Sequence, residues 1–265
     1  MFKAIRRKIK NKVPKSLKDY FFSIQQIPKR FSNYKIVCEN LKNSKTLEIG
    51  GPSSMFYTKL PIYQKIKSLD VVNFSNKTTW EGAIKEGYTC NYYRNKFAYQ
   101  HISEAADLEK INNDSYDAII SSHCLEHVAN PIKALMRWKN ILTSNGIMLL
   151  VLPNKIGNFD HKRKDTTIEH LILDCENNTN ENDTTHFEES IQLYDLDRRP
   201  GEKIALNTHI NIVNDNFNNR EVHHHVFSKK LIFETMKFCG FEIINYLENN
   251  EDLITLCKKK IIKIQ

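Results

Sequence analysis

The sequence has few of the residues that mark fibrous, disulfide-stabilised or membrane-spanning proteins. Its 265 residues include only 8 Gly and 7 Pro, which excludes collagen-like and most low-complexity chains. The 6 Cys residues are scattered without a CxxC pair, so we expect reduced thiols in the cytoplasm rather than a zinc ribbon or a disulfide framework. The longest aliphatic run, residues 147–152, is far shorter than the roughly 20 apolar residues that cross a bilayer. No transmembrane segment or secretory signal is expected.

Positive charge exceeds negative charge, but it is concentrated at the two ends of the chain. The formal net charge is +8, and seven Lys and Arg residues lie within residues 1–15. A second basic group occupies residues 258–263, so the remainder is nearly balanced and we expect no nucleic-acid partner. Residues 1–40 are predicted to form a basic helical segment that is solvated or makes weak contact with an anionic membrane surface. No pattern indicates an oligomeric state.

Apolar strand-like runs alternate with an amphipathic helical pattern over residues 41–153. This alternation predicts an α/β fold with a mostly parallel sheet. Residues 227–265 resume the pattern and are predicted to complete the core, with Ser228 as the N-cap of a helix that ends near Phe238. The predicted strands cover residues 46–49, 66–72, 116–121, 147–152, 241–247 and 253–257, and the last two form a hairpin at an antiparallel edge.

Residues 154–226 interrupt this alternation. They are polar, rich in Asn, Asp, Thr and His, and show only a short helical pattern near residues 166–173. A structureless run of this length is improbable inside a compact domain. We therefore predict an inserted subdomain or lid. If the protein transfers a chemical group, this insert is expected to bind the molecule that accepts the group.

A glycine turn follows the first predicted strand at Glu48-Ile49-Gly50-Gly51. Glycine lets a ligand approach the backbone closely, and carboxylates at the ends of neighbouring strands, here Glu48 and Asp70, suit a cationic or ribose-bearing cofactor. The turn lacks a full GxGxxG and a phosphate cradle at a helix start. It therefore favours a nucleoside cofactor without a pyrophosphate.

Residues 46–152 and 227–257 resemble the class I S-adenosylmethionine-dependent methyltransferases. The resemblance is carried by the glycine turn after the first strand, by the strand that contains Asp70, and by the segments SEAADLEKI and YDAIISSHCLEHVANPIKALMRWKNILTSNGIMLLVLPN. The resemblance implies a Rossmann-like, seven-stranded, mostly parallel sheet with an antiparallel edge strand, and a His-rich insert after the fifth strand. It also implies cofactor-binding roles for seven residues: Glu48, Gly50 and Gly51 around the methionine part, Asp70 at the ribose, Asp107 beside adenine, and Ser122 and His123 beneath the transferable methyl.

Residues 123–127 also spell HxxEH, a motif of one group of zinc hydrolases in which a helix places both histidines on one face. Here the motif begins at the end of an apolar strand. We therefore interpret Glu126 and His127 as caps and packing partners of the following helix. A metal-dependent hydrolase is kept as an alternative.

Seven of the 10 histidines lie between residues 161 and 225, among many acidic residues. Imidazole accepts a proton near neutral pH and binds divalent metals, and a segment after the fifth strand is expected to face the cofactor pocket. We predict a general base in this cluster, with His223 or His225 first, and a divalent-metal site as a variant. The candidate bases are His223, His225, His170 and His123, and the candidate metal ligands are His223, His225, His170 and His186.

The insert resembles that of bacterial methyltransferases encoded with surface-polysaccharide genes, such as those for capsules. This resemblance implies methyl transfer from S-adenosylmethionine to a hydroxyl, or another heteroatom, of a sugar, a sugar nucleotide or a phosphate-bearing glycan precursor. Alternatives are an RNA methyltransferase that uses the basic surface and a non-catalytic cofactor-binding module. The arginines that could hold a phosphate are Arg163, Arg198, Arg199 and Arg220.

Overall fold

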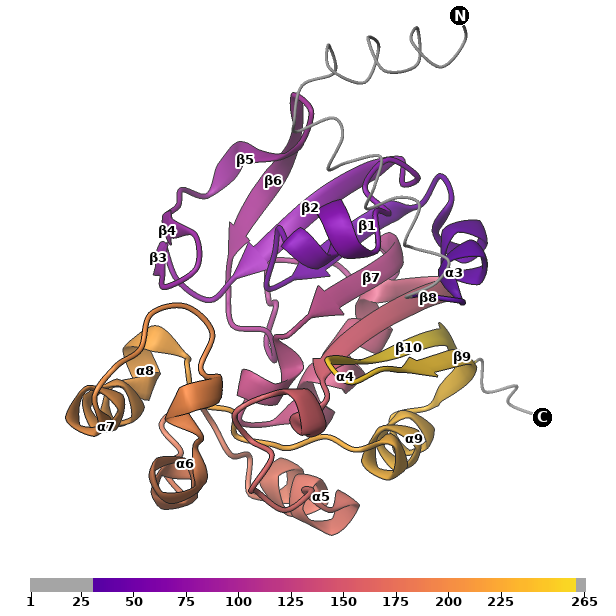
Figure 1. The fold of residues 1–265 in the computed structure, drawn as a ribbon. Helices are drawn as coiled ribbons and strands as arrows, with labels where there is room; N and C mark the ends of the chain where they lie inside the picture. Colours follow the sequence, from indigo (N-terminus) through magenta and orange to yellow (C-terminus); the bar gives the residue numbers. More distant parts are fainter. Residues whose placement is uncertain (1–30, 261–265) are drawn as a thin grey trace, which may run out of the picture.

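The computed structural model describes residues 31–260 of the chain. Most of the basic segment predicted at residues 1–40 therefore lies outside the described residues, which begin just before helix α3 (Tyr34–Leu41). Figure 1 shows a central sheet with helices on its faces and a group of short helices at one end. Across residues 31–260, no helix combines the length and the apolar character needed to span a membrane.

The sheet contains eight strands in the order β5-β6-β2-β1-β7-β8-β10-β9. The five strands from β6 to β8 are mutually parallel, β5 is antiparallel to β6, and β10 is antiparallel to both β8 and β9. A separate two-stranded hairpin joins β3 (Lys77–Thr78) to β4 (Gly82–Ala83). The strands of the large sheet are β1 (Lys45–Ile49), β2 (Ser68–Asn73), β5 (Gly87–Tyr93), β6 (Lys96–Ile102), β7 (Tyr116–Ser122), β8 (Leu142–Pro153), β9 (Phe241–Glu248) and β10 (Asp252–Lys259).

The α/β fold and its mostly parallel sheet agree with the sequence prediction, but the prediction of seven strands is wrong. The added strand is β5, which forms an antiparallel edge next to β6. A two-residue turn at Arg94 and Asn95, both with positive φ, reverses the chain between these strands. The predicted hairpin at the other edge is present as β9 and β10.

Helices cover both faces of the sheet, and their capping residues explain where two of them begin. Asn130 accepts a hydrogen bond from the backbone N–H of Lys133 and caps α4 (Pro131–Ile141). Ser228 caps α9 (Lys229–Phe238) in the same way, as the sequence predicted. Three short helical elements follow strands β1, β7 and β8, namely η1 (Met55–Lys59), η2 (Leu125–His127) and η3 (Lys155–Gly157).

Successive side chains of strand β8 point to opposite faces of the sheet and so contribute to two separate hydrophobic clusters. Met148 and Leu150 belong to a cluster that includes residues of α4 and α9, whereas Leu149 and Val151 belong to a cluster on the other face with residues of α3 and η1. A strand that is buried on both faces needs a continuous apolar sequence. This requirement explains the unbroken aliphatic run at residues 147–152.

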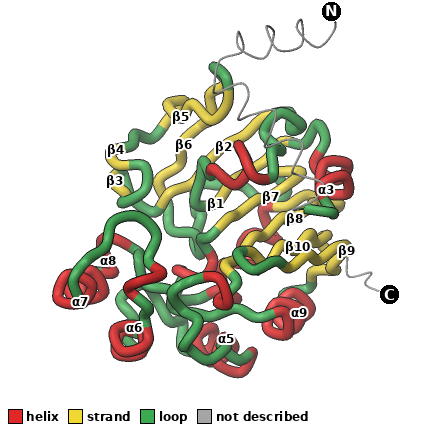
Figure 2. Tube along the Cα trace, viewed as in Figure 1, coloured by secondary structure: helices red, strands yellow, loops and turns green. Residues whose placement is uncertain are grey.

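The segment that was predicted as an insert contains more helix than its sequence suggested. Thr167 caps α5 (Ile168–Glu176), close to the short helical pattern expected near residues 166–173. Further elements follow: α6 (Phe187–Leu193), η4 (Leu196–Arg198), α7 (Leu206–Asn214) and α8 (Asn216–Asn219). Figures 1 and 2 show α6, α7 and α8 as short helices linked by loops, beside the carboxyl ends of the parallel strands.

Candidate active site

A cavity of about 630 Å³ lies at the carboxyl ends of the parallel strands. This edge of an open α/β sheet is where ligands usually bind, and the volume suits a cofactor with a small substrate. The lining residues come from the loops after four strands, from the β3–β4 hairpin and from the insert. They include Gly50, Pro52, Ser53, Met55, Asn73, Phe74, Trp80, Glu81, Ser103, Glu104, Ala105, Ser122, His123, Cys124, His127, Val128, Glu181, Pro200 and Arg220.

The conformation of the loop after β1 depends on the buried side chain of Glu48 and on two glycines, Gly50 and Gly51. Glu48 is fully buried and accepts hydrogen bonds from the Tyr63 hydroxyl (2.6 Å) and the Ser53 backbone N–H (2.9 Å). Burial raises the pKa of Glu48 to about 8, against the effect of these two donors. Gly50 lines the cavity with φ +76°, a conformation that favours glycine. Glu48 therefore supports the loop from behind rather than facing the cavity.

Gly51 leaves no room for a side chain, because an added Cβ would lie 2.3 Å from the carboxyl carbon of Glu48. Together, Gly50 and Gly51 let the backbone pass closely over the strand end. Gly50 lines the cavity and Gly51 does not, so Gly50 is the residue whose backbone can meet the expected methionine part of the cofactor, and Gly51 lets the loop pack against Glu48.

The acidic residue predicted to hold the ribose, Asp70, is placed away from the cavity. Its carboxylate accepts hydrogen bonds from the Tyr116 hydroxyl (2.7 Å) and the Tyr99 backbone N–H (3.2 Å) within the sheet. Strand β2 continues for three more residues and ends at Asn73, which lines the cavity. The structure thus puts Asn73, not Asp70, at the strand end from which a side chain can reach a ligand.

Asp107, the residue predicted to lie beside adenine, is also placed away from the cavity. Asp107 does not line the cavity and pairs with Lys133, with 2.8 Å between Oδ1 and Nζ. The cavity wall after β6 is formed instead by Ser103, Glu104 and Ala105.

Ser122 and His123 do line the cavity, at the end of β7. His123 Nε2 lies 3.0 Å from Asp252 Oδ1, and because a carboxylate only accepts, Nε2 carries the hydrogen and Nδ1 has the lone pair. Burial alone would lower the pKa of His123, but the hydrogen bond to Asp252 and the nearby Glu126 raise it above its ordinary value. The side chain is thereby an oriented proton acceptor at the cavity wall.

The insert contributes one wall of the cavity and is tied to the core by Arg220. The guanidinium contacts Glu104 after β6 (2.7 Å) and Glu181 of the insert (2.9 Å), and all three residues line the cavity. Of the four arginines considered for phosphate binding, Arg220 is the one in the cavity lining, and the other three are Arg163, Arg198 and Arg199. Arg163 is buried in ion pairs with Asp160 and Glu189.

Glu126, His127 and His223 form a compact group next to the cavity. Glu126 is fully buried, and its Oε1 lies 3.8 Å from His127 Nε2 and 4.0 Å from His223 Nε2. Burial raises the pKa of Glu126, opposed by His223 and His123, and it lowers the pKa of His127 well below the ordinary value. Of the three residues, His127 lines the cavity.

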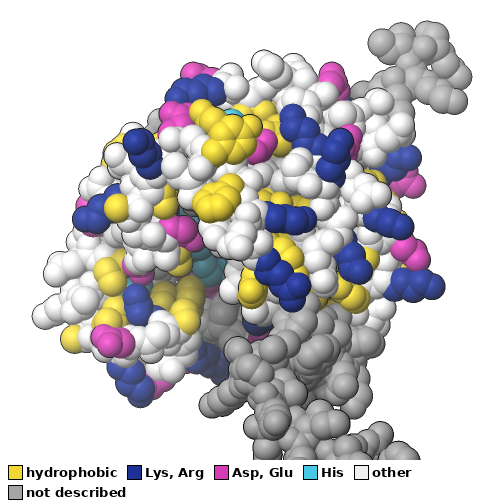
Figure 3. Space-filling model, turned by 90° about the horizontal axis from the view of Figure 1, so that it is seen from above, with side chains coloured by type: hydrophobic (Ala, Val, Ile, Leu, Met, Phe, Trp, Pro, Cys, Tyr) yellow, Lys and Arg dark blue, Asp and Glu magenta, His cyan; other side chains and the backbone are white. Residues whose placement is uncertain are grey.

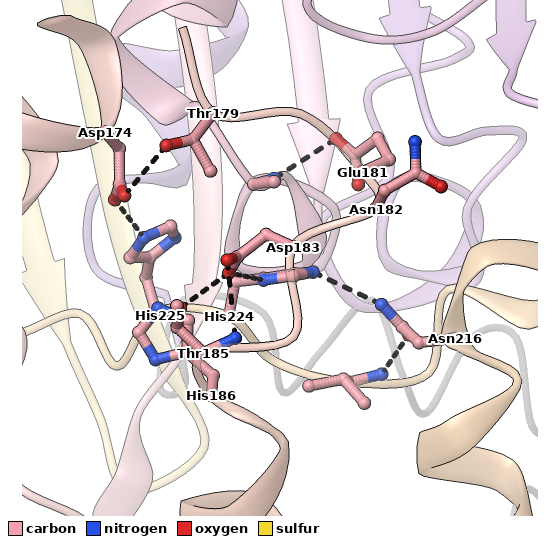
Figure 4. A network of polar contacts seen from close by, with 12 residues as sticks. Asp174, Thr179, Glu181, Asn182, Asp183, Thr185, His186, Asn216, His224 and His225 are labelled. Atoms are coloured by element: carbon pink, nitrogen blue, oxygen red, sulfur yellow. Dashed lines mark hydrogen bonds and ion pairs between the residues drawn. The ribbon is translucent and has the colours of Figure 1, made fainter. Parts of the chain in front are cut away.

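The other predicted histidines lie in a second group, away from the cavity lining. His170 Nε2 is 3.1 Å from His186 Nε2, and His225 Nε2 is 3.0 Å from Asp174 Oδ2. Figure 4 shows this polar network, in which Asp174 and His225 are joined and Asp183 lies close to His224. Burial and the neighbouring histidines lower the pKa of His186 to about 3. The predicted metal set is therefore split, because His170, His186 and His225 meet while His223 joins Glu126.

Sequence reasoning missed Asn73, Glu104, Glu126 and His127 as residues of the site or its border. A usable signal existed for two of them, since Glu126 and His127 belong to HxxEH directly after an apolar strand. We interpreted them as caps and packing partners of the next helix. Asn73 and Glu104 carry no local signal, because their roles depend on where a strand ends or on a contact across the fold.

Comparison with known proteins agrees with this geometry. A family model described as a methyltransferase domain matches residues 24–245, so the chain belongs to this family of methyltransferase domains. No curated protein sequence matches the chain significantly. With the cofactor cavity at the strand ends, the protein is an S-adenosylmethionine-dependent methyltransferase.

The chain shares its fold with a solved structure of 10% sequence identity. An S-adenosylmethionine-dependent methyltransferase from Mesorhizobium loti aligns with a TM-score of 0.52 and 10% identity, over 86% of this chain and 96% of that chain. The 1,6-didemethyltoxoflavin-N1-methyltransferase of Burkholderia thailandensis, solved with 1,6-didemethyltoxoflavin and S-adenosylhomocysteine bound, aligns with a TM-score of 0.49 and 10% identity. That alignment covers 92% of this chain and 85% of the other.

Proposed function

We propose that the enzyme methylates a hydroxyl, or another heteroatom, of a small molecule, and that His123 is the general base. The acceptor that we propose is a sugar, a sugar nucleotide or a phosphate-bearing precursor of a surface glycan, and the reaction takes place in the cytoplasm. The observation that carries the base assignment is the His123–Asp252 pair at the cavity wall. The other candidate bases, His170, His223 and His225, are not among the lining residues.

The proposed step is a single displacement. S-adenosylmethionine supplies an electrophilic methyl group on its sulfonium. His123 takes the proton of the acceptor hydroxyl at Nδ1, while Asp252 holds Nε2–H and stabilises the imidazolium that forms. The bond from oxygen to the methyl carbon forms as the bond from sulfur to that carbon breaks, which leaves S-adenosylhomocysteine. Holding the two reactants in line supplies much of the remaining acceleration.

The small-molecule acceptor is favoured over RNA by the character of the surface and of the cavity. Figure 3 shows Lys and Arg side chains interspersed with acidic and hydrophobic ones on the face that it presents, whereas RNA binding calls for a continuous basic surface. The cavity wall contains the insert residues Glu181, Pro200 and Arg220, which restrict its size. Arg220 and Lys59 are the lining cations that suit a phosphate group on the acceptor.

The cofactor assignment is tested by calorimetric titration of S-adenosylhomocysteine into the full chain. We expect micromolar affinity, a loss of about tenfold or more in Asn73→Ala, and little change in Asp70→Asn. The two variants form a matched pair on one strand, of which only Asn73 lines the cavity. A larger loss of affinity in Asp70→Asn than in Asn73→Ala would show that Asp70 holds the ribose. Absence of binding by the wild type would contradict the cofactor assignment.

The acceptor class is tested by measuring S-adenosylhomocysteine formation with free sugars, sugar phosphates, sugar nucleotides and RNA. We expect turnover with a sugar-containing small molecule. We expect His123→Gln to lower kcat by about 10²–10⁴-fold with unchanged S-adenosylhomocysteine affinity. Turnover with RNA alone would overturn the acceptor proposal, and full activity of His123→Gln would overturn the base.

A further inference from the structure

Glu126, which lies beside His127 and His223, has two buried oxygens without a hydrogen-bond donor in the described part of the chain. Within residues 31–260, neither carboxylate oxygen of Glu126 has a hydrogen-bond partner, although the residue is fully buried. A buried carboxylate without a hydrogen-bond partner is strongly destabilising, so such a group calls for a specific partner. The nearest candidates are His127 Nε2 and His223 Nε2, at 3.8 and 4.0 Å from Oε1, beyond hydrogen-bond distance.

The far nitrogen of each imidazole is already held by an acceptor. His127 Nδ1 lies 3.1 Å from the carbonyl oxygen of Val222, and His223 Nδ1 lies 2.5 Å from Asp160 Oδ2. Because a carbonyl and a carboxylate only accept, both Nδ1 atoms carry hydrogen, and Nε2 is the atom of each ring that can offer a lone pair to an ion. Arg163 in turn donates to Asp160 Oδ1 at 3.1 Å. Two imidazole lone pairs and one carboxylate thus face a common space with no donor between them.

We propose that Glu126, His127 and His223 bind a divalent transition-metal ion. Two imidazoles and one carboxylate are a common catalytic ligand set that leaves coordination positions open. Ligands about 2.0–2.2 Å from an ion lie roughly 3–4 Å from one another, and the two measured separations are 3.8 and 4.0 Å. The contacts of Nδ1 to Val222 and Asp160 are the outer interactions that typically orient ligating histidines.

The place of this site beside the cavity gives the ion a role in methyl transfer. His127 lines the cavity, as does His123 at the start of the same HxxEH stretch. An ion held by Glu126, His127 and His223 would coordinate the acceptor oxygen and lower the pKa of its hydroxyl, which eases proton transfer to His123. This role rests on the proposed function, whereas ion binding by the three residues does not.

Two further groups of metal-ligating residues share His186. Hydrogen bonds engage Nε2 of each of their four histidines, while Nδ1 of His224 and of His225 has no hydrogen-bond partner within residues 31–260. His170 pairs with His186, His225 with Asp174, and His224 with the amide of Asn216. These contacts join α5, the start of α6 and residues 224–225, and Figure 4 shows those of Asp174 with His225 and of Asn216 with His224. We infer that this network stabilises the insert and binds no ion. A substitution within it therefore serves as the control for substitutions at the proposed metal site.

The test uses the full chain stripped of metal and titrated calorimetrically with Zn²⁺ and with Mn²⁺. We expect one ion per chain, and a loss of affinity of about 100-fold or more in Glu126→Gln and in His223→Gln. Asp160→Asn, which alters an outer contact, should lose about 10–100-fold. The matched control His186→Gln, in the second histidine group, should bind as the wild type does. Circular dichroism and a separate titration with S-adenosylhomocysteine establish that each variant is folded.

An X-ray absorption spectrum of the Zn²⁺-loaded wild type answers the same question without any variant. We expect two imidazole ligands, the remaining ligands oxygen, and no sulfur. The proposal is overturned by three or more imidazoles, by the absence of stoichiometric binding of either ion, or by binding that only His186→Gln abolishes. Because cofactor affinity is measured independently, loss of the metal site and failure of the proposed methyl transfer give different results.

Discussion

Asp70 and Asn73 illustrate how much depends on where a strand stops. Both are polar, both lie on β2, and they are three positions apart. Pairing of β2 with β6 continues as far as Asn73 opposite Ile102, so the carboxyl end of the strand is at Asn73. The sequence shows only an acidic residue near the end of an apolar run. That pattern does not predict which residue is the last to pair with the neighbouring strand.

Gly51 allows a test of the loop after β1. In Gly51→Ala the new methyl group would overlap the Glu48 carboxyl group, which is buried and cannot move freely. We expect the affinity for S-adenosylhomocysteine to fall at least about tenfold and stability to fall by about 1–3 kcal/mol, as for other overpacked sites. The measurements are calorimetric titration and thermal unfolding.

The control for this variant is Gly82→Ala. Gly82 has φ +69° but no atom within 4 Å of an added Cβ, so it reports backbone strain without a steric clash. Equal losses of cofactor affinity in the two variants would contradict the role given to the contact with Glu48.

Asp252 is expected to set the pH at which His123 works. Its hydrogen bond raises the pKa of His123, so Asp252→Asn should lower that pKa. A general base must be deprotonated, and the rising acidic limb of the pH profile of kcat/KM should therefore move to lower pH. A limb that stays in place would show that another group governs the profile.

Among the secondary-structure elements, the insert depends most on contacts made at a distance along the chain. Its helices are short, and its polar sequence contains few apolar positions with helical spacing. Tertiary contacts rather than intrinsic propensity therefore decide that the short helices α6, α7 and α8 form. Arg220 supplies one such contact, because Glu104 is 116 positions away in the sequence.

Removing this contact should loosen the insert. Arg220→Ala leaves Glu104 and Glu181 without their shared cation, and breaking a largely buried ion pair typically costs about 3–5 kcal/mol. We expect faster proteolysis within residues 154–226 and a lower melting temperature. Arg199→Ala is the matched control, since Arg199 pairs with Glu221 inside the same segment. Similar proteolysis rates for both variants would argue against Arg220 as the link to the core.

The stability of the whole molecule should depend on pH through its buried histidines. The pKa of His186 is lowered to about 3 from an ordinary value of 6.5, so His186 is neutral in the folded protein over that range. As the pH falls below 6.5, the unfolded chain takes up the proton first, and stability is lost progressively towards pH 3. Allowing for the partial exposure of His186, we expect up to about 1 kcal/mol per pH unit.

Denaturant unfolding at pH 7, 6 and 5 measures this dependence. His186→Gln cannot take up the proton, so its free energy of unfolding should fall less steeply than that of the wild type between pH 6.5 and pH 5. Identical slopes for the two proteins would assign the acid sensitivity to other groups.

The sequence by itself determined the α/β class, the α4 and α9 helices, the central strands and the glycine turn at residues 50–51. These features follow from local periodicity, capping and the conformational freedom of glycine, which neighbouring residues specify directly. Tertiary structure alone decided that His223 meets Glu126 and His127 while His225 pairs with Asp174. His223 and His225 are two positions apart and would share one face of an extended segment. They join different groups because their partners, Asp160 and Asp174, lie 63 and 51 positions away in the sequence.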